Sequence, residues 1–464
     1  MTKNKTDVQV REKKETVLFE QQYIELYEQY TDTICSHSAT ALNAGRDKAF
    51  KKFRELGFPT PQVENYKYTD LREPLSVDYG LNIKRVNFPI NPYDVFKCDV
   101  PGISAYLYFV VNDAFYPTNY ERNKSLPEGV IVTSLRQASE EHSELVEKHI
   151  SKLADKQNDG LVAFNGAFAQ DGFFIYVPKN VILDRPIQII NIMRSDVDFM
   201  ANSRNLVVVE QGAKAQMLVC DHTVDDVRFF SNRVTEVFVG ENAFYEHYKL
   251  ESVSRETTDV STLLIKQEQN SNVLGNLLTL HNGVSRNNVE IALDGENCET
   301  HLCGMALSDG KQVVDNFTSI LHNKPNSHSN ELFKYILDDE AKGGFTGRLY
   351  VEKDAQKTLA YQNNKNILLK RTAKMRTRPQ LEIFADDVKC SHGATIGQLD
   401  EKAMFYMRQR GIPEKEARML LMFAFAADVI EFIRIDALKD RIKKMVEKRL
   451  RGGHSKCDGC SFCS

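Results

Sequence analysis

The sequence predicts a mainly β protein with a β-solenoid core between two helical regions. From about residue 162 to residue 400, short runs rich in Val, Ile, Phe and Thr alternate with polar turns, and no long helical period interrupts them. The turns recur at a nearly constant spacing. Helical periodicity appears only before and after this stretch. A β unit too short to bury its own apolar side chains is stable when it stacks on copies of itself.

The repeat emerges when the turns are aligned. Each turn follows an apolar residue, contains Gly, Asn, Asp or other polar residues, and ends on a small or β-branched residue. The clear turns are Val177–Val181, Val209–Ala213, Val239–Ala243, Leu293–Cys298, Val351–Ala355 and Phe384–Val388, and weaker ones end at Ser271 and Ser327. Their ends lie roughly 30 residues apart, a solenoid period. A β-sandwich is the alternative, but its turns recur about every 8 to 12 residues.

Four regions follow from these patterns. Residues 1–160 form a helical and mixed N-terminal region, and residues 161–399 form the solenoid core. Residues 400–451 form a C-terminal helical region, in which Gly411 ends one helix and Pro413 suits the first turn of the next. Residues 452–464 form a cysteine-rich tail. Helices at both ends would cover the strand edges that a stack of coils exposes.

Composition excludes several classes of function. The chain has 464 residues and a net charge of -4, so no global charge favours nucleic acid or anionic membrane. The N-terminus lacks the apolar stretch of a secretory signal. The most apolar run, Met419–Ala427, is far shorter than the roughly 20 residues that span a bilayer. The nine cysteines are odd in number, which favours reduced thiols. We therefore expect a cytoplasmic protein.

Cys390 and His392 are the candidate metal ligands. If their segment is extended, both side chains project from the same face of the strand. A thiolate and an imidazole suit iron, zinc or copper(I) better than magnesium or calcium. Two ligands do not complete a site, so the others must come from elsewhere in the chain or from a partner. A buried thiol beside a hydrogen-bonded histidine is the structural alternative.

Two further groups of cysteines stand out. Cys298, His301 and Cys303 are close in sequence, but Cys298 would face away from the other two in a strand, which favours core packing inside the solenoid. Cys457, Cys460 and Cys463 form overlapping CxxC pairs near the C-terminus, where His454 or a partner would have to complete a four-ligand site. A tail without a fixed structure is the other interpretation.

Several nucleotide and hydrolase motifs are absent. The sequence contains no phosphate-binding loop, no nucleophile elbow and no HExxH zinc pair. We therefore expect no ATP site in this chain.

Several segments together resemble the SufD members of the SufB/SufD family, which belong to the SufBCD iron-sulfur cluster assembly complex. The central one is residues 389–400, KCSHGATIGQLD. The others are GFPTP at 57–61, ENYKYT at 64–69, RNNV at 286–289 and YMRQRGI at 406–412. The likeness extends from about residue 20 to 450. The cysteine-rich tail is not part of that family pattern.

The resemblance implies a right-handed parallel β-helix and a non-catalytic scaffold subunit. It implies a SufB-like β-helical partner, with Cys390 and His392 facing it and helping to hold iron or a transient, shared iron-sulfur cluster. It also implies a SufC-like ATPase docked on the C-terminal helices, and it allows a homodimer of the isolated chain. No nucleic acid or membrane partner is implied.

Two other classes of function compete with this interpretation. A solenoid carbohydrate-active protein would carry clustered carboxylates on an exposed face and normally an export signal. A thiol-based metal or sulfur delivery protein would depend on Cys457, Cys460 and Cys463.

Overall fold

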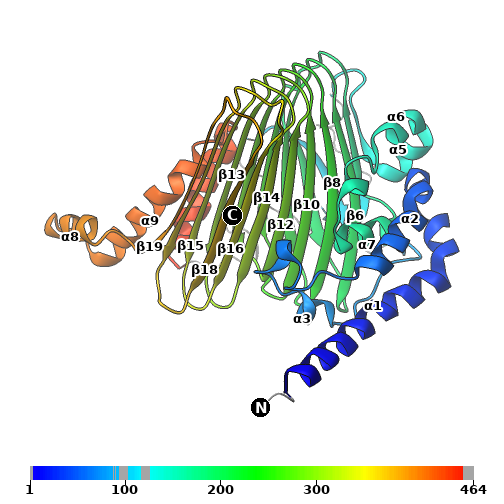
Figure 1. Cartoon of the computed structure of the whole chain (residues 1–464), viewed down its shortest axis with the longest axis horizontal. Helices are drawn as coiled ribbons and strands as arrows, with labels where there is room; N and C mark the ends of the chain where they lie inside the picture. Colours follow the sequence, from blue (N-terminus) through cyan, green and yellow to red (C-terminus); the bar gives the residue numbers. More distant parts are fainter. Residues whose placement is uncertain (1–3, 87, 89, 93–102, 117–125, 453–464) are drawn as a thin grey trace.

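The computed structural model describes residues 4–86, 88, 90–92, 103–116 and 126–452. Its strands form two sheets, and successive strands of the core alternate between them (Figure 1). From β4 to β19, every ladder between neighbouring strands of a sheet is parallel. This topology is a β-solenoid, so the predicted fold class is confirmed.

Each sheet takes every second strand of the solenoid. The nine-stranded sheet contains β4 (Phe173–Val177), β6 (Phe199–Val209), β8 (Phe229–Val239), β10 (Thr257–Gln267), β12 (Val284–Leu293), β14 (Val313–His322), β16 (Lys342–Val351) and β18 (Lys374–Ile383). The ten-stranded sheet contains β5 (Ile187–Met193), β7 (Lys214–Thr223), β9 (Phe244–Ser252), β11 (Asn272–His281), β13 (Glu299–Ser308), β15 (His328–Leu337), β17 (Leu359–Leu368) and β19 (Lys389–Gly397).

Three strands before residue 160 complete the sheets at the N-terminal end. β1 (Tyr106–Val111) is parallel to β5, and β2 (Ala114–Tyr116) is antiparallel to β1. β3 (Ile131–Ser134) is antiparallel to β4. The sheets therefore begin inside the region predicted as N-terminal and mixed. The division into four regions itself remains a prediction.

The predicted turns contain a residue in the left-handed conformation at each of six successive coils. Asn180, Gly212, Asn242, Asn270, Asn297 and Asn326 have φ between 55° and 69°. Glycine and asparagine adopt this conformation at the lowest cost. The asparagine side chains also form a ladder, since Asn270 Nδ2 donates to Asn242 Oδ1 at 3.0 Å and Asn297 Nδ2 donates to Asn270 Oδ1 at 3.2 Å.

The turn after β16 departs from this pattern. Ala355 is buried, as the sequence repeat predicts, but the left-handed residue is Lys357, with φ of 58°. This turn is longer than the five turns before it, those after β6, β8, β10, β12 and β14, so the reversal moves two residues beyond the alanine. Its backbone then contacts the next turn, since Lys357 N donates to Asp387 O at 2.6 Å.

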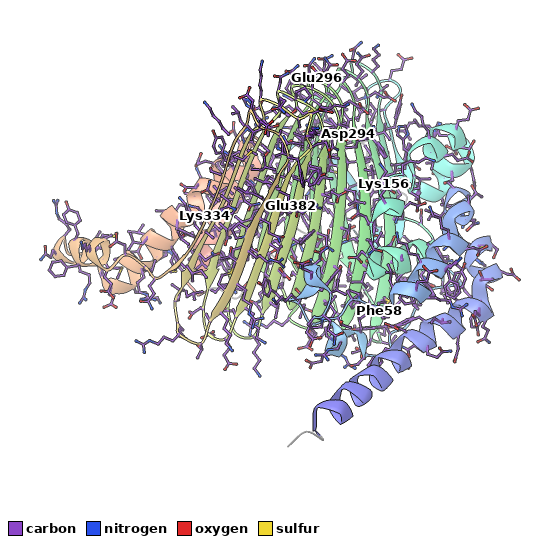
Figure 2. The ribbon with its side chains drawn as sticks, viewed as in Figure 1. Phe58, Lys156, Asp294, Glu296, Lys334 and Glu382 are labelled. Carbon is purple, nitrogen blue, oxygen red and sulfur yellow. The ribbon has the colours of Figure 1, made fainter. Side chains whose placement is uncertain are left out.

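The N-terminal helices pack on the outer face of the nine-stranded sheet. Aromatic side chains from α1 (Asn4–Ser36), α2 (Thr40–Leu56) and α7 (Gly160–Phe168) form one cluster against β6, β8 and β10. Tyr27 stacks on Phe50 with ring centroids 3.9 Å apart, and Phe58 joins the cluster from the connector (Figure 2). Shorter helices nearby are η1 (Glu64–Tyr66), α3 (Arg72–Leu75), α5 (Leu135–Glu141), α6 (Ser143–His149) and η3 (Ala154–Lys156).

The connector after α2 is fixed to the solenoid by Arg286 of β12. The Arg286 guanidinium lies 4.5 Å from the ring centroid of Tyr66 and donates to Asn65 O at 2.7 Å and Asp315 Oδ2 at 2.6 Å. Tyr66 is 1% exposed. The aromatic motif at 64–69 therefore docks on the sheet, and a buried cation holds it there.

The same connector continues to the last coil. Glu64 forms an ion pair with Arg378, and the Arg376 guanidinium lies 5.5 Å from the ring centroid of Tyr68. Both arginines belong to β18. The N-terminal region thus supports the outer face of the final strand of the nine-stranded sheet.

The C-terminal helices lie on the outer face of the ten-stranded sheet. Apolar residues of α9 (Glu414–Ile430) and α10 (Asp436–Leu450) pack on outward side chains of β11, β13 and β15. Lys334 of β15 donates to Phe425 O at 2.8 Å and pairs with Asp428 at 2.5 Å (Figure 2). Among the residues that the structure describes, no helix is long and apolar enough to cross a membrane.

The interior of the solenoid contains a buried ionic network as well as an apolar core. Arg233 donates to Asp221 at 2.6 Å and to Asp259 at 2.5 Å, and Lys249 donates to Asp259 at 2.9 Å. The network borders a cavity of about 20 Å³, which has room for about one water molecule. Buried charges are tolerated only when they are paired in this way.

Candidate metal site at the open end of the solenoid

The last strand of each sheet leaves an open backbone edge. β19 pairs with β17 from Leu359↔Lys389 to Ile367↔Gly397, and it ends the ten-stranded sheet (Figure 1). β18 pairs with β16 and ends the nine-stranded sheet. No further strand among the described residues covers either edge. Alternate N–H and C=O groups along these edges therefore remain available to another chain.

Cys390 and His392 lie on this final strand, two residues apart. Cys390 stands opposite Ala360, packs against the solenoid core and against the cluster of Val351, Ala355 and Ala385, and is half-buried. His392 stands opposite Gln362 and is exposed. The strand predicted from the sequence is present, and both side chains share the face that continues the interior of the solenoid.

The Cys390 thiol is protonated in the isolated chain at neutral pH. Burial raises the pKa of Cys390 above its ordinary value, and a backbone hydrogen bond at Ala360 offsets part of the shift. Metal ions bind the thiolate rather than the thiol. A metal at this position must therefore displace a proton.

The site within this chain is incomplete. The part of the chain that the structure describes contains no group of three or more His, Cys, Asp or Glu residues arranged to hold a metal ion. Any closed site at the open end needs donors from outside the described residues.

Exposed apolar side chains also lie on the last strands at this end. Those exposed by more than a third include Ile396 of β19, Tyr361 of β17, Ile383 of β18 and the adjacent Phe384. Their exposed fractions run from 37% to 58%. Apolar residues gathered beside unpaired strands are typical of a protein interface.

The cluster Cys298, His301 and Cys303 is divided between the two faces of the sheet. Cys298 is buried in the solenoid core, as predicted, and its Sγ contacts Gly295 O at 3.2 Å. Cys303 is buried under the C-terminal helices, outside the solenoid, where burial raises the pKa of its thiol. His301 pairs with Glu299 at 3.1 Å. These residues do not form one site.

The third group of cysteines belongs to the C-terminal tail. Cys457, Cys460, Cys463 and His454 lie outside the described residues. The metal-binding interpretation of this tail therefore stays a prediction.

The sequence reasoning missed two polar side chains beneath the pair. Glu331 and Gln362 are almost fully buried, and in register they continue the column of His392 toward the interior. The sequence feature that could have revealed them is a polar residue at a strand position whose side chain faces the interior of the solenoid. It is weak, because many other coils carry inward polar residues as well.

The helix α8 (Glu401–Gln409) forms a second exposed surface close to this end. None of its residues is buried, and Phe405 and Tyr406 are 63% and 57% exposed. A groove of about 390 Å³ runs between α8, α9 and the last coils, lined by Leu369, Leu399, Met404 and Arg418 among others. Figure 1 shows α8 projecting beyond the solenoid.

The molecule is thus a parallel β-solenoid with N-terminal and C-terminal helices packed on its outer faces and a thiol–imidazole pair on its last strand. Two family models match almost the whole chain: the SUF system FeS cluster assembly SufBD core domain at residues 191–425, and the SufBD protein N-terminal region at residues 18–189. The chain belongs to the SufBD family of iron-sulfur cluster assembly proteins. The resemblance stated from the sequence motifs is therefore confirmed.

Curated relatives give the same assignment. An iron-sulfur cluster assembly SufBD family protein of Synechocystis is 28% identical over 85% of this chain and 88% of its own length. The iron-sulfur cluster assembly protein SufD of Escherichia coli is 33% identical over 54% of this chain and 60% of its own length. SufD of Bacillus subtilis is 28% identical over 70% and 74%.

The raised pKa of Cys390 predicts its reactivity. In the isolated chain, alkylation of Cys390 by iodoacetamide should increase with pH through a midpoint above that of the same cysteine in a peptide of residues 386–398, because only the thiolate reacts. Mass spectrometry of the peptide containing Cys390 gives the rate at each pH. Restricted access lowers every rate but leaves the midpoint unchanged. A midpoint at or below that of the free peptide contradicts the burial effect.

Proposed function

We propose that this chain is a non-catalytic scaffold subunit that builds iron-sulfur clusters at an interface with a second, SufB-like β-helical subunit. The supporting observation is the position of Cys390 and His392 on an unpaired final strand, beside exposed apolar residues. A partner that pairs with β18 and β19 would bury these side chains and add the missing donors. The proposed place of action is the cytoplasm.

The cluster is cargo in this proposal. A thiolate from Cys390 and a neutral imidazole from His392 are ligands that iron accepts. A shared interface lets the cluster leave when the two subunits separate, since neither holds a full ligand set. Without a SufB-like partner, the same edge would pair two copies of this chain into a homodimer.

The C-terminal helices would dock a SufC-like ATPase. The chain carries no recognisable ATP-binding motif, so nucleotide chemistry must come from a partner. α8 offers exposed aromatic side chains, while α9 and α10 fix its base to the ten-stranded sheet. Movement driven by ATP hydrolysis would thus be transmitted to the sheet that ends in Cys390 and His392.

The first test measures iron in the assembled complex. Cys390→Ala and His392→Ala should each lower the iron and acid-labile sulfide content of a complex purified with its SufB-like and SufC-like partners by about tenfold, since each removes a ligand. Folding should persist, because Cys390 is half-exposed and His392 is exposed. Ser391→Ala, on the opposite face of the same strand, is the matched control. Wild-type iron and sulfide content in both variants would reject the proposal.

The second test concerns the ATPase. Phe405→Ser should weaken binding of the SufC-like subunit by about 30-fold, the cost of losing an aromatic residue central to an interface. Isothermal titration with the purified ATPase measures this change. Phe244→Ser removes another exposed phenylalanine, 45% exposed, from the first position of β9 and serves as control. Equal affinities for the Phe405 variant and the wild type would show that the ATPase docks elsewhere.

A further inference from the structure

Glu331, Gln362 and His392 form a column on the inner face of the last coils. Glu331 of β15 is the register partner of Gln362 of β17, which is the register partner of His392 of β19. In a parallel ladder, residues in register direct their side chains to the same face. One coil further from the open end, the register partner of Glu331 is Leu302 of β13, which is fully buried and apolar. The polar column therefore leads only to the open end.

Gln362 is held in one orientation by Glu331. Gln362 is 1% exposed, and its Nε2 donates to Glu331 Oε2 at 2.6 Å. When Glu331 is ionised, its carboxylate only accepts hydrogen bonds, so the amide must present its NH₂ group to it. The interior has room for this amide because residue 347 is glycine: a Cβ there would lie 2.2 Å from Gln362 Nε2.

The other end of the same amide has no partner. Gln362 Oε1 is buried and accepts no hydrogen bond from any residue that the structure describes. The oxygen and nitrogen of an amide diverge from one carbon, so with Nε2 on Glu331 the oxygen Oε1 points in another direction; β19 is the other strand that flanks β17 in the sheet. A buried acceptor without a donor is costly, and such atoms in native proteins usually have a specific role.

A metal-binding histidine needs an acceptor of this kind. One ring nitrogen binds the metal, and the other normally donates its N–H to a carboxylate or carbonyl group, which fixes the tautomer and the ring orientation. His392 has no carboxylate in register beside it. Gln362 Oε1 is the neighbouring buried acceptor on the same face.

We propose that Gln362 is a positioning residue for His392: its Oε1, which has no partner in the structure, would accept a hydrogen bond from one imidazole N–H and so leave the other nitrogen unprotonated toward the open edge. Glu331, one coil further from the open end, orients the amide of Gln362. This inference rests on the proposed function, since it explains how a single strand presents a metal-ready imidazole. It assigns no metal contact to Gln362 or Glu331.

The test measures the tautomer of His392 in the isolated chain, without iron. Protein labelled with ¹⁵N at histidine is studied by NMR at pH 8, because burial raises the pKa of Glu331 to about 7 and its carboxylate is then mainly ionised. The signal of His392 is assigned by its loss in His392→Ala. Wild-type protein should show one dominant tautomer. If wild-type protein instead shows two tautomers in the proportion found for a free histidine peptide, the inference is overturned. This outcome needs no variant of Gln362.

Variants sharpen the result. Gln362→Met keeps the length of the side chain but removes the acceptor, so the ratio of the two tautomers should change by about fivefold, the effect of one ordinary hydrogen bond. Asn363→Leu changes the next residue, which faces the opposite side of β17, and should leave the ratio unchanged. An unchanged ratio in Gln362→Met contradicts the inference.

The two proposals fail separately. The tautomer of His392 is measured without partner or metal, so a negative result removes only the role of Gln362. Conversely, wild-type iron content in the His392→Ala complex rejects the proposed function whatever the tautomer. If both proposals hold, the Gln362→Met complex should bind iron about tenfold more weakly than the Asn363→Leu complex.

Discussion

The open edge of the parallel ladder is the constraint on which the rest of this structure depends. Each coil buries its apolar side chains against its neighbours, so a stack of coils has two ends that no further coil covers. At the N-terminal end, β2 and β3 turn antiparallel, and helices pack against the first coils. At the other end, β18 and β19 have no further strand beside them among the described residues.

The expectation that helices cover the strand edges at both ends is wrong at this end, because the C-terminal helices pack on the outer face of the ten-stranded sheet. The chain supports the open end without covering its edges. Arg286 anchors the N-terminal connector, whose Glu64 and Tyr68 reach the arginines of β18 on the outer face of one sheet. On the outer face of the other sheet, Lys334 joins β15 to α9. Both sheets are thus held from outside, while their last inner side chains stay accessible. A rigid support of this kind suits a site that a partner must complete.

The sequence allowed much of the fold to be predicted, because the repeat is tied to backbone conformation. Asparagine or glycine recurs at six successive turns, and these residues adopt the left-handed conformation at the lowest cost. The longer turn at Lys357 could not be predicted, since the buried Ala355 still matches the pattern. The sequence pattern also did not reveal that β1, β2 and β3 complete the two sheets at the N-terminal end. Pairing between distant segments leaves no local periodicity.

The candidate site was predicted only in part. The spacing of Cys390 and His392 indicates a shared face in any strand, and the structure contains that strand. The roles of Glu331 and Gln362 depend on register between strands about 30 residues apart, which no local pattern reveals. Because side chains alternate between the two faces of a strand, the sequence already predicted that Cys298 and Cys303 lie on opposite faces. The burial of Cys303 under the C-terminal helices required the tertiary structure.

The central claim is that a partner completes the edge formed by β18 and β19. Hydrogen–deuterium exchange of the amides at residues 374–383 and 389–397 tests it most directly, comparing the isolated chain, diluted to a monomer, with its complex with the SufB-like subunit. The account predicts rapid exchange along the outer edge of β19 in the monomer and strong protection in the complex. Equal protection in both states would contradict it.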